Sequence, residues 1–475
     1  MAAGKLAGHQ FSIVVIAFTV AFIILFGIYG RYSAETHPVS AHDFANVSRN
    51  APLLHDTHAF ILIGFGFLAT FLRRYGFSAI AINLLLVAFV LEWALLIRGF
   101  LSVEFSESSL FSISIRDIAK ADYTATAVLV SYGALVGKLS PIQYLMLAAI
   151  ETPISILNEY LVVTKLGLGD IGGSIVVHFF GAIFGVIASR IVYKQQWTLS
   201  EHQGSIYHSD IFSFIGTVFL WAFWPSFNSI FTVTAAEQQR AVLNTFLALI
   251  ASTVTTFLAS QLVHKDRRFN IKHIASASLS GGVASGVVAT LILQPFPALI
   301  LGAVAGIVSV LSFQYLTPFL AKKFNIHDTR GVLSLHAVPA VVGLLASVVI
   351  LFVTDLKVYG ETIRNIYILH RSDRYVEGRA PAEQAIYQLL GLGVTFIIAA
   401  VTGAITGFLL KLKIWRQVRD KEYFADADIF DVPEDYDFTT RVTSHIERVE
   451  LTEHVEKRQL LNNDPIVPTT VTTTA

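Results

Sequence analysis

Two histidines in apolar surroundings share a sequence context. Asp170 opens the segment DIGGSIVVH, which ends at His178, and Asp328 opens DTRGVLSLH, which ends at His336. In both segments a glycine follows the aspartate within three residues and the histidine stands eight positions after it. Imidazole donates and accepts hydrogen bonds and titrates near neutral pH, so two of them inside a membrane could bind and pass on a small polar molecule. His58 also falls at the edge of an apolar stretch but lacks this context.

Each of the two aspartates stands where a helix cap belongs. At the start of an apolar span, a carboxylate can accept hydrogen bonds from the first free backbone amides. We therefore predict that Asp170 and Asp328 are supporting acids that cap and orient the histidine helices; direct contact with a substrate is the alternative. Two imidazoles without a thiolate or a third ligand leave a metal ion under-coordinated. The pattern predicts no metal site and no cofactor.

The elements that must position these residues are long and apolar. Of the 475 residues, 54% are hydrophobic and 14% are charged, against about a quarter charged in soluble proteins. The apolar residues fall in blocks of about twenty, the length with which an α-helix crosses the hydrocarbon core. The first block could be a secretory signal, but it is long for one and lacks a clear cleavage site, so we interpret it as a retained span. We predict an all-α polytopic membrane protein of about twelve transmembrane helices, at residues 11–30, 58–72, 77–98, 118–137, 141–163, 170–193, 210–232, 241–263, 271–293, 296–319, 329–354 and 386–411.

Basic residues indicate the orientation of these spans. An even number of spans places both termini on one side, and the loops of that side hold more Lys and Arg, the loop before the last span excepted. The positive-inside rule then predicts cytoplasmic N and C termini. The one N-glycosylation sequon begins at Asn46, in the first loop on the predicted outer face, so Asn46 is the predicted glycosylation site.

The same reasoning divides the chain into two parts. Residues 1–412 form the predicted transmembrane domain, and residues 413–475 form a polar cytoplasmic tail. The tail contains the acidic run DKEYFADADIFDVPEDYDF. Such a run is interpreted as a solvated face, and a docking site for a cytoplasmic partner is the alternative.

The two histidine segments enter the membrane from opposite sides in this topology. The sixth span begins at the outer face and the eleventh at the inner face. Eight residues of helix advance about 12 Å, close to half the hydrocarbon thickness. The two spans are offset by five positions in the order of spans, an odd number. The spacing predicts an inverted internal repeat of spans 2–6 and 7–11 with a shared site at the midplane, as recurs in transporters.

Composition excludes several classes of function. The chain has no cysteine, so disulfides, thiolate catalysis and cysteine-ligated metals are excluded. Its formal net charge is zero, and no basic surface for nucleic acid is indicated. An HExxH motif and a nucleophile elbow are both missing from the sequence, so we predict that the protein is not an enzyme.

Longer segments make the chain recognisable. It resembles the Rhesus-type (Rh) glycoproteins of the ammonium transporter/Rh superfamily over nearly its whole length. The segments that carry the resemblance are GFGFLATFLRRYGFSA (64–79), GKLSPIQYL (137–145), DIGGSIVVHFFGAIFG (170–185), FLWAFWPSFNS (219–229), YLTPFL (315–320), HDTRGVLSLHAVPAVVG (327–343) and KEYFADADIFDVPED (421–435). The ammonium-transporter branch holds its cation with a tryptophan, and no tryptophan occurs here between Trp93 and Trp197, which favours the Rh branch.

The resemblance implies a homotrimer in which each subunit encloses its own narrow pore. It implies that His178 and His336 are the hydrogen-bonded pair midway along this pore. It also implies that Tyr123 and Phe227 form an aromatic gate on the outer side. The chain departs from the family at two places: Tyr123 replaces the usual phenylalanine, and LHAVPA replaces the more familiar LHGIPG.

The function that the resemblance implies is an ammonia or ammonium channel in the plasma membrane, conducting neutral ammonia through a hydrophobic pore. Its partners would be this small-molecule substrate and membrane lipids. Two alternatives stay open. The same pore could pass carbon dioxide, or the protein could be a membrane scaffold that anchors the cytoskeleton through its tail. The presence of both histidines favours conduction.

Overall fold

The computed structural model describes residues 9–36, 44–367, 379–420 and 422–433. It divides the chain into a large unit, Met1–Ala425, and a small one, Asp426–Ala475. The elements of the large unit, in chain order, are α2 (Gln10–Tyr29), β1 (Gly30–Tyr32), η1 (Ala34–Thr36), α3 (Phe44–Ala59), η2 (Phe60–Gly64), α4 (Phe65–Leu68), η3 (Ala69–Phe71), α5 (Gly76–Phe100), α6 (Val103–Ser108), β2 (Phe111–Ile113), α7 (Ile115–Leu135), α8 (Pro141–Glu159), η4 (Tyr160–Lys165), η5 (Ser174–Phe179), α9 (Phe180–Val192), α10 (Gln196–Leu199), η6 (Glu201–Gln203), α11 (Tyr207–Ser229), α12 (Ala235–Val263), α13 (Ile271–Ala277), α14 (Ser280–Ser285), α15 (Pro295–Leu311), η7 (Ser312–Leu316), α16 (Thr317–Phe324), η8 (Leu333–Ala337), α17 (Val338–Val353), η9 (Leu356–Thr362), α18 (Ile363–Ile366) and α19 (Pro381–Leu410).

The all-α membrane fold predicted from the sequence is confirmed. Within the described residues, ten helices are long and apolar enough to cross a membrane. Several of them run through a π-helical turn without ending, so that α8 continues into η4 and η5 continues into α9. The ten helical segments are Gln10–Tyr29, Ala51–Phe71, Gly76–Phe100, Pro141–Lys165, Ser174–Val192, Tyr207–Ser229, Ala235–Val263, Pro295–Phe324, Leu333–Val353 and Pro381–Leu410.

The two remaining predicted spans are enclosed mostly by protein, as Ser174–Val192 also is. The span predicted at 118–137 is α7, a helix of 21 residues that is buried almost throughout its second half. The span predicted at 271–293 is not one helix: it breaks into α13, α14 and a following turn. A Cβ on Gly281 would meet the carbonyl oxygen of Ala248 on α12 at 2.2 Å, and one on Gly282 would meet Trp224 on α11 at 2.5 Å. Small residues here permit close backbone packing, which weakens the helix as a continuous element.

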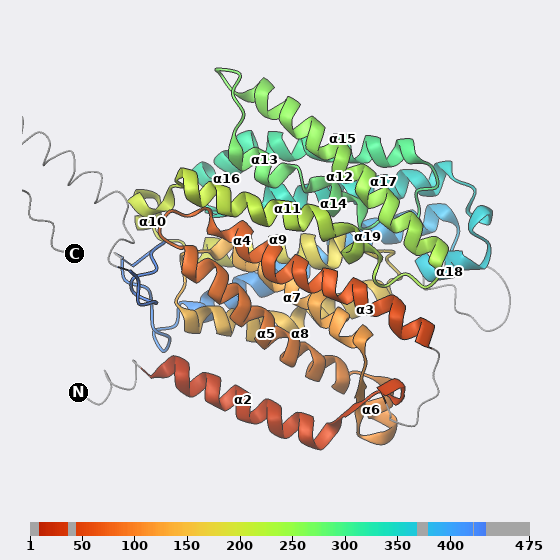
Figure 1. The fold of residues 1–475 in the computed structure, drawn as a ribbon, viewed down its shortest axis with the longest axis horizontal. Coiled ribbons are helices and arrows are strands. Elements are labelled where there is room, and N and C mark those ends of the chain that lie inside the picture. Colours follow the sequence, from red (N-terminus) through yellow and green to blue (C-terminus); the bar gives the residue numbers. More distant parts are fainter. Residues whose placement is uncertain (1–8, 37–43, 368–378, 421, 434–475) are drawn as a thin grey trace, which may run out of the picture. The chain divides into compact units, whose positions relative to one another are not determined.

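The first described helix, α2, begins at the same end of this unit at which the last helix, α19, ends. Gln10, in the first turn of α2, donates from its amide to the carbonyl of Ile414, and its own oxygen accepts from the amide of Arg416, beyond α19. In Figure 1 the start of α2 lies on the left side of the unit, as α10 and α16 do, whereas α6, α18 and the start of α3 lie on the right. We call these the α10 end and the α6 end.

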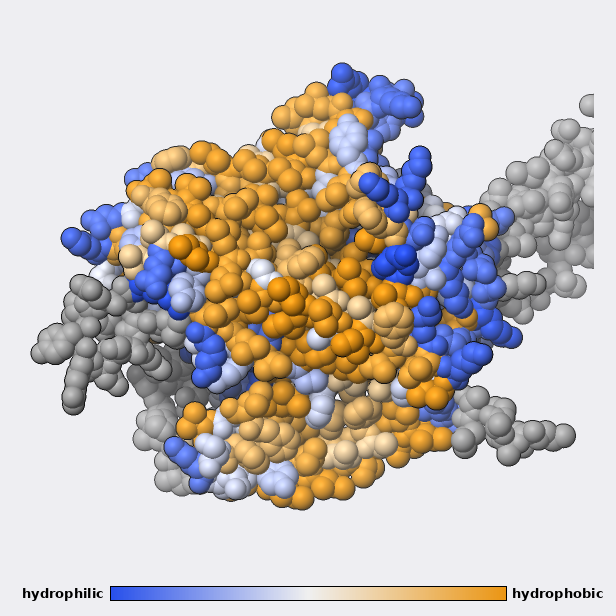
Figure 2. Space-filling view, turned by 180° about the vertical axis from the view of Figure 1, so that it is seen from behind, coloured by the Kyte–Doolittle hydropathy of each residue, from blue (hydrophilic) through white to orange (hydrophobic). Residues whose placement is uncertain are grey.

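The surface between the two ends is apolar. Figure 2 shows a broad hydrophobic band with hydrophilic residues at either side of it. Large hydrophobic side chains on several spans are well exposed, among them Ile16 of α2, Val254 of α12, Phe352 of α17 and Ile397 of α19. Such a surface is stable against lipid chains and not against water, so it fits a protein embedded in a bilayer.

Candidate functional site

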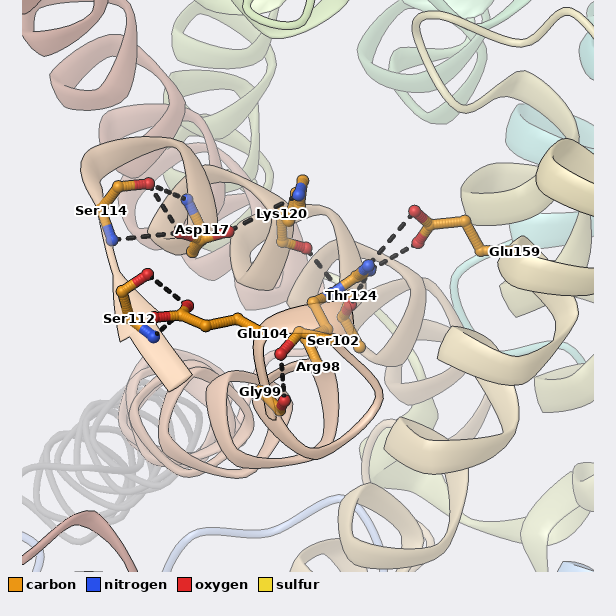
Figure 3. Close-up of polar contacts among 10 residues, drawn as sticks. All are labelled: Arg98, Gly99, Ser102, Glu104, Ser112, Ser114, Asp117, Lys120, Thr124 and Glu159. Atoms are coloured by element: carbon orange, nitrogen blue, oxygen red, sulfur yellow. Dashed lines mark hydrogen bonds and ion pairs between the residues drawn. The ribbon is translucent and has the colours of Figure 1, made fainter. Parts of the chain in front are cut away.

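A wide cavity opens at the α6 end, with both polar and apolar residues in its lining, and we call it the vestibule. It has a volume of about 930 Å³, and its lining includes Arg98, Tyr123, Glu159 and Asp170. Figure 3 shows how Arg98 of α5 reaches Glu159 at the end of α8. Both terminal guanidinium nitrogens donate to the Glu159 carboxylate, at 3.2 and 2.5 Å, and one also donates to the Thr124 hydroxyl at 2.9 Å. This two-pronged contact fixes three helices around the mouth of the cavity.

The start of α7 is held in place beside this cavity by a reciprocal cap. The Ser114 hydroxyl accepts from the amide of Asp117, while the Asp117 carboxylate accepts from the amide of Ser114 at 3.0 Å. The neighbouring Glu104 carboxylate accepts from both the amide and the hydroxyl of Ser112, which lowers the pKa of Glu104 (Figure 3). The cap fixes the direction in which α7 leaves the vestibule, and Tyr123 lies two turns further along it.

Three stacked aromatic rings close the floor of this cavity. The rings of Tyr123 and Phe227 lie 4.2 Å apart between centroids with planes at 11°, and Phe60 stacks on Phe227 at 4.7 Å. The Tyr123 hydroxyl donates to the carbonyl of Phe227 at 2.5 Å. The carbonyl of Ile171, at 3.2 Å, is a second acceptor within its reach. Phe60 and Phe227 are completely buried. The pair predicted from the sequence is therefore brought together, and Phe60 joins it as a third ring.

The two predicted histidines meet directly behind this stack. Their ring centroids are 5.2 Å apart and their planes differ by 14°. His178 lies 5.9 Å from Phe227 on one side, and His336 lies 6.0 Å from Phe65 on the other, again between centroids. Both histidines are buried. Both ring nitrogens of His178 lack a hydrogen-bond partner within the described part of the chain, and so does Nδ1 of His336.

The same local backbone presents each histidine. His178 lies in the π-helical turn η5 and His336 in the π-helical turn η8. Ahead of each turn stands a glycine with positive φ, Gly173 at 69° and Gly331 at 81°. A side chain would be strained in this conformation, and a Cβ on Gly331 would also approach Phe313 to 2.2 Å. Single π-turns within helices often accompany functional sites.

The two aspartates hold these turns by their first amides. One oxygen of Asp170 accepts from Ile175 and Val176 at 2.8 and 2.9 Å. Asp328 uses both oxygens, one for Gly331 and Val332 and the other for Leu333, at 2.8 to 3.0 Å. These bonds satisfy backbone donors that the helix itself leaves free. The aspartates thus act on the histidines through the backbone.

A small cavity continues the column beyond the histidines. It has a volume of about 20 Å³, room for one molecule the size of water. His336 lines it on one side, with Phe65, Asn83 and Val332 around it and Arg330 among its walls. Vestibule, aromatic stack, histidine pair and this cavity therefore follow one another through the unit.

Other predicted or candidate residues lie outside this column. His58 places Nδ1 3.2 Å from the buried carboxylate of Asp122 and 3.1 Å from the carbonyl of Leu54, so it supports α7 next to Tyr123. The backbone of Asn46 lies near the start of α3. Over the residues that the structure describes, His, Asp and Glu form no group of three that could hold a metal ion.

Sequence reasoning missed Phe60, Arg330 and the π-turns. Phe60 is one of 36 phenylalanines and has no neighbouring polar residue that sets it apart from the others on its span. Arg330 stands inside the recognised DTRGVLSLH segment, and a cation two residues after the capping aspartate was a usable signal. A π-turn has no residue signature that reveals it.

Replacement of Tyr123 by phenylalanine should destabilise the protein modestly. The substitution keeps the stacked ring but removes the buried hydroxyl that donates to Phe227, a loss of about 1 kcal/mol in the free energy of unfolding. Thermal unfolding in detergent measures this. Tyr32→Phe is the matched control, because Tyr32 is 79% exposed and its replacement should change little. Equal stability of both variants and wild type would contradict the hydrogen bond's contribution.

Known proteins resemble this chain over most of its length. The model of the Ammonium Transporter Family matches residues 14–430. The pig Ammonium transporter Rh type B is 42% identical over 422 residues, covering 87% of this chain and 90% of the pig protein. The human Ammonium transporter Rh type B is 40% identical over 422 residues, covering 87% of this chain and 91% of its own length.

Solved structures show the same fold. The Rh50 protein of Nitrosomonas europaea, a Rhesus-family channel, superimposes with a TM-score of 0.71 and 31% identity, covering 88% of this chain and all of Rh50. Mep2 of Saccharomyces cerevisiae superimposes with a TM-score of 0.63 at 17% identity, covering 84% and 90% of the two chains, which shows the fold alone. With the family model matched over 417 of 475 residues (430 − 14 + 1) and curated Rh relatives at 40% identity or more, the chain belongs to the ammonium transporter family, in its Rhesus branch.

Proposed function

We propose that this protein conducts neutral ammonia through the column formed by the vestibule, the aromatic stack, the histidine pair and the small inner cavity. The observation that carries the proposal is the pair itself: two buried imidazoles, 5.2 Å apart between centroids, of whose four ring nitrogens three meet no hydrogen-bond partner among the described residues. A buried polar group is normally satisfied, so free ring nitrogens at this depth suit a polar molecule that passes.

The chemistry of the column favours a neutral molecule over an ion. Phe60, Phe227 and Phe65 offer no group that could replace the hydration shell of an ammonium ion, whose burial in such surroundings is prohibitive. Ammonia loses far less hydration, and it can both donate to and accept from imidazole. The vestibule, with the carboxyl groups of Glu159 and Asp170 on its lining, is the place where ammonium would give up its proton.

We also propose that the two imidazoles share a hydrogen bond when ammonia passes. Two imidazoles joined end to end by an N–H···N bond of about 2.9 Å would lie about 5 Å apart between centroids. The observed separation of 5.2 Å fits this distance, and a rotation of the nearly parallel rings would bring their free nitrogens into contact. One ring nitrogen of each histidine then remains for the substrate. Which nitrogen carries the proton is set by the partner that the other nitrogen meets.

The inverted repeat belongs to the same proposal. The sixth and eleventh spans each begin with a capping aspartate, a glycine of positive φ and a π-turn that contains the histidine. This common order supports an inverted relation between spans 2–6 and 7–11, with the histidines at the shared site.

For the whole molecule we propose the arrangement that the family resemblance implies. Residues 1–412 act as the channel domain of a homotrimer in the plasma membrane, without enzymatic activity. Both termini face the cytoplasm, residues 413–475 form the tail, which could dock a cytoplasmic partner, and Asn46 is glycosylated on the outer face. Glycosidase treatment of wild type and of Asn46→Gln tests the glycosylation of Asn46. The mass of the detergent-solubilised complex tests the homotrimer.

Ammonia uptake into proteoliposomes tests the proposed function. Wild type should raise the rate of alkalinisation in stopped-flow traces above that of bare lipid. The double variant His178→Ala, His336→Ala should return it to the rate of bare lipid, because the two polar partners at the narrowest depth are lost. His208→Ala is the matched control, because His208 is exposed on α11, away from the column, and should conduct like wild type.

A carbon dioxide arm separates the rival functions. Wild type that speeds carbon dioxide but not ammonia would keep the pore and change the substrate. Wild type that speeds neither gas would favour the scaffold function. Ammonia flux that is unchanged in the double histidine variant would contradict the assignment of His178 and His336 as the polar partners in the pore.

A further inference from the structure

The wall of the small inner cavity contains an arginine that lies among apolar groups. Arg330 is only 4% exposed and lines the 20 Å³ cavity together with His336. Its backbone amide donates to the carbonyl of Gly133 at 3.2 Å, which pins this segment to the end of α7. The carbon of its guanidinium lies 5.1 Å from the ring centre of Phe71. The side chain is therefore held at the far end of the pore from the vestibule.

No carboxylate among the residues that the structure describes forms a hydrogen bond with Nε or with one terminal nitrogen of this guanidinium. Among those residues, these two nitrogens have no other hydrogen-bond partner either. The nearest acid in sequence, Asp328, already accepts from three backbone amides. Asp210, at the start of α11, accepts from the Ser205 hydroxyl at 3.0 Å. The buried guanidinium therefore lies beside the cavity without a direct ion-pair partner among the described residues, and the carboxylates of Asp210 and Asp328 offset its charge only through space.

A buried cation without an ion-pair partner is unfavourable for folding. The guanidinium cannot escape by losing its proton, since arginine stays charged in proteins. A side chain that only filled space against Phe71 could be apolar. Ionisable groups at membrane depth that face a pathway commonly control what passes along it, and a fixed arginine can exclude cations from a pore.

We propose that Arg330 is the charge barrier of this pore, a specificity-determining residue that turns back ammonium and other cations at the α10 end while neutral ammonia passes. The inference rests on the proposed function, because it assigns a selectivity element to the same column. A positive charge at the cavity beside His336 repels a cation there strongly, since little water screens it. It exerts no comparable force on a neutral molecule.

Two readouts on the same proteoliposomes test the barrier. Stopped-flow ammonia uptake reports the neutral flux, and currents evoked by an ammonium gradient on a solid-supported membrane report the cation. Arg330→Met should raise the ammonium-evoked current roughly tenfold relative to the ammonia flux of the same vesicles, the change expected when a close charge repulsion in a poorly screened site is removed. Arg330→Lys should keep the current of wild type, because the charge remains.

Two further variants make the result independent of the arginine's contribution to folding. Asn83→Asp leaves Arg330 in place and puts a carboxylate of nearly the same shape on the same cavity, so it too should raise the current. Arg190→Gln removes an exposed cation at the end of α9 and should leave both readouts unchanged. If Arg330→Met does not fold, the ammonium-evoked current of Asn83→Asp alone tests the barrier.

The failure of this inference differs from that of the proposed function. Ammonia flux above bare lipid together with currents in Arg330→Met and Asn83→Asp within twofold of wild type would overturn the barrier and leave the channel intact. A lower melting temperature of Arg330→Met with no change in current would show a purely structural side chain. Wild-type vesicles that take up ammonia no faster than bare lipid would remove the proposed function, and the barrier with it.

Discussion

Asp328→Ala is expected to lower the free energy of unfolding by about 3 kcal/mol and to abolish conduction. The carboxylate accepts from Gly331, Val332 and Leu333. Its loss leaves three backbone donors at the start of η8 without a partner, two of them in buried residues. Each such donor costs roughly 1 kcal/mol or more, as measured for lost caps and buried hydrogen bonds. The turn that presents His336 then loses its anchor.

A melting temperature lower by about 5 °C in detergent, together with ammonia uptake at the rate of bare lipid, would match this expectation. Asp170→Ala should have a smaller effect on stability, because Asp170 accepts from two amides and not three. Asp355→Ala is the matched control: its carboxylate also accepts a backbone amide, that of Lys357, but at an exposed site. The expectation fails if Asp328→Ala melts like Asp355→Ala.

The fold was predictable because lipid imposes a simple pattern on the helices that touch it. Segments such as Gly76–Phe100 and Pro381–Leu410 are continuous apolar runs, and the sequence places them to within a few residues. The prediction was weakest where a segment is enclosed by protein. The stretch predicted as one span at 271–293 contains Gly281, Gly282 and Gly286 among serines, and it folds as two short helices because its neighbours, not lipid, determine its shape.

The candidate site was predictable only as far as polarity marks it. His178 and His336 are conspicuous because an imidazole in an apolar span is costly, and the structure brings their rings 5.2 Å apart. Phe60 is chemically ordinary for a membrane span, so only the three-dimensional packing on Phe227 distinguishes it. The π-turns arise from one extra residue within a helical turn, and no residue type announces that insertion. Arg330 required knowledge of which cavity its side chain lines.

Acidification is expected to destabilise the protein through His327, in the loop between α16 and η8. Burial foremost, and then the cations of Lys138 and Lys272, lower the pKa of His327 to about 2. The Gln203 side-chain amide contacts its Nε2, and the Trp197 ring lies 5.9 Å away. The imidazole is therefore neutral in the folded protein, while in the unfolded chain it binds a proton below about pH 6.5.

The direction of the pH dependence follows from this difference. Between about pH 6.5 and pH 2 the unfolded state holds one proton more at this site, so the free energy of unfolding falls as the pH falls. The slope approaches about 1.4 kcal/mol per pH unit. Stability from this residue is thus fully present above pH 6.5 and is lost progressively below it.

His327→Gln isolates this contribution from that of all other titrating groups. Glutamine can still accept from Gln203 but carries no proton at any of these pH values. The variant should be less stable than wild type at pH 7.5, because the packed ring is lost, and the gap should close by roughly 2 kcal/mol by pH 5. Melting temperatures at pH 7.5, 6 and 5 measure the gap, with His208→Gln, a change at an exposed histidine, as the control. A gap that stays constant over this range would mean that His327 binds a proton as readily in the folded protein as in the unfolded chain, and that burial and the cations of Lys138 and Lys272 do not govern its proton.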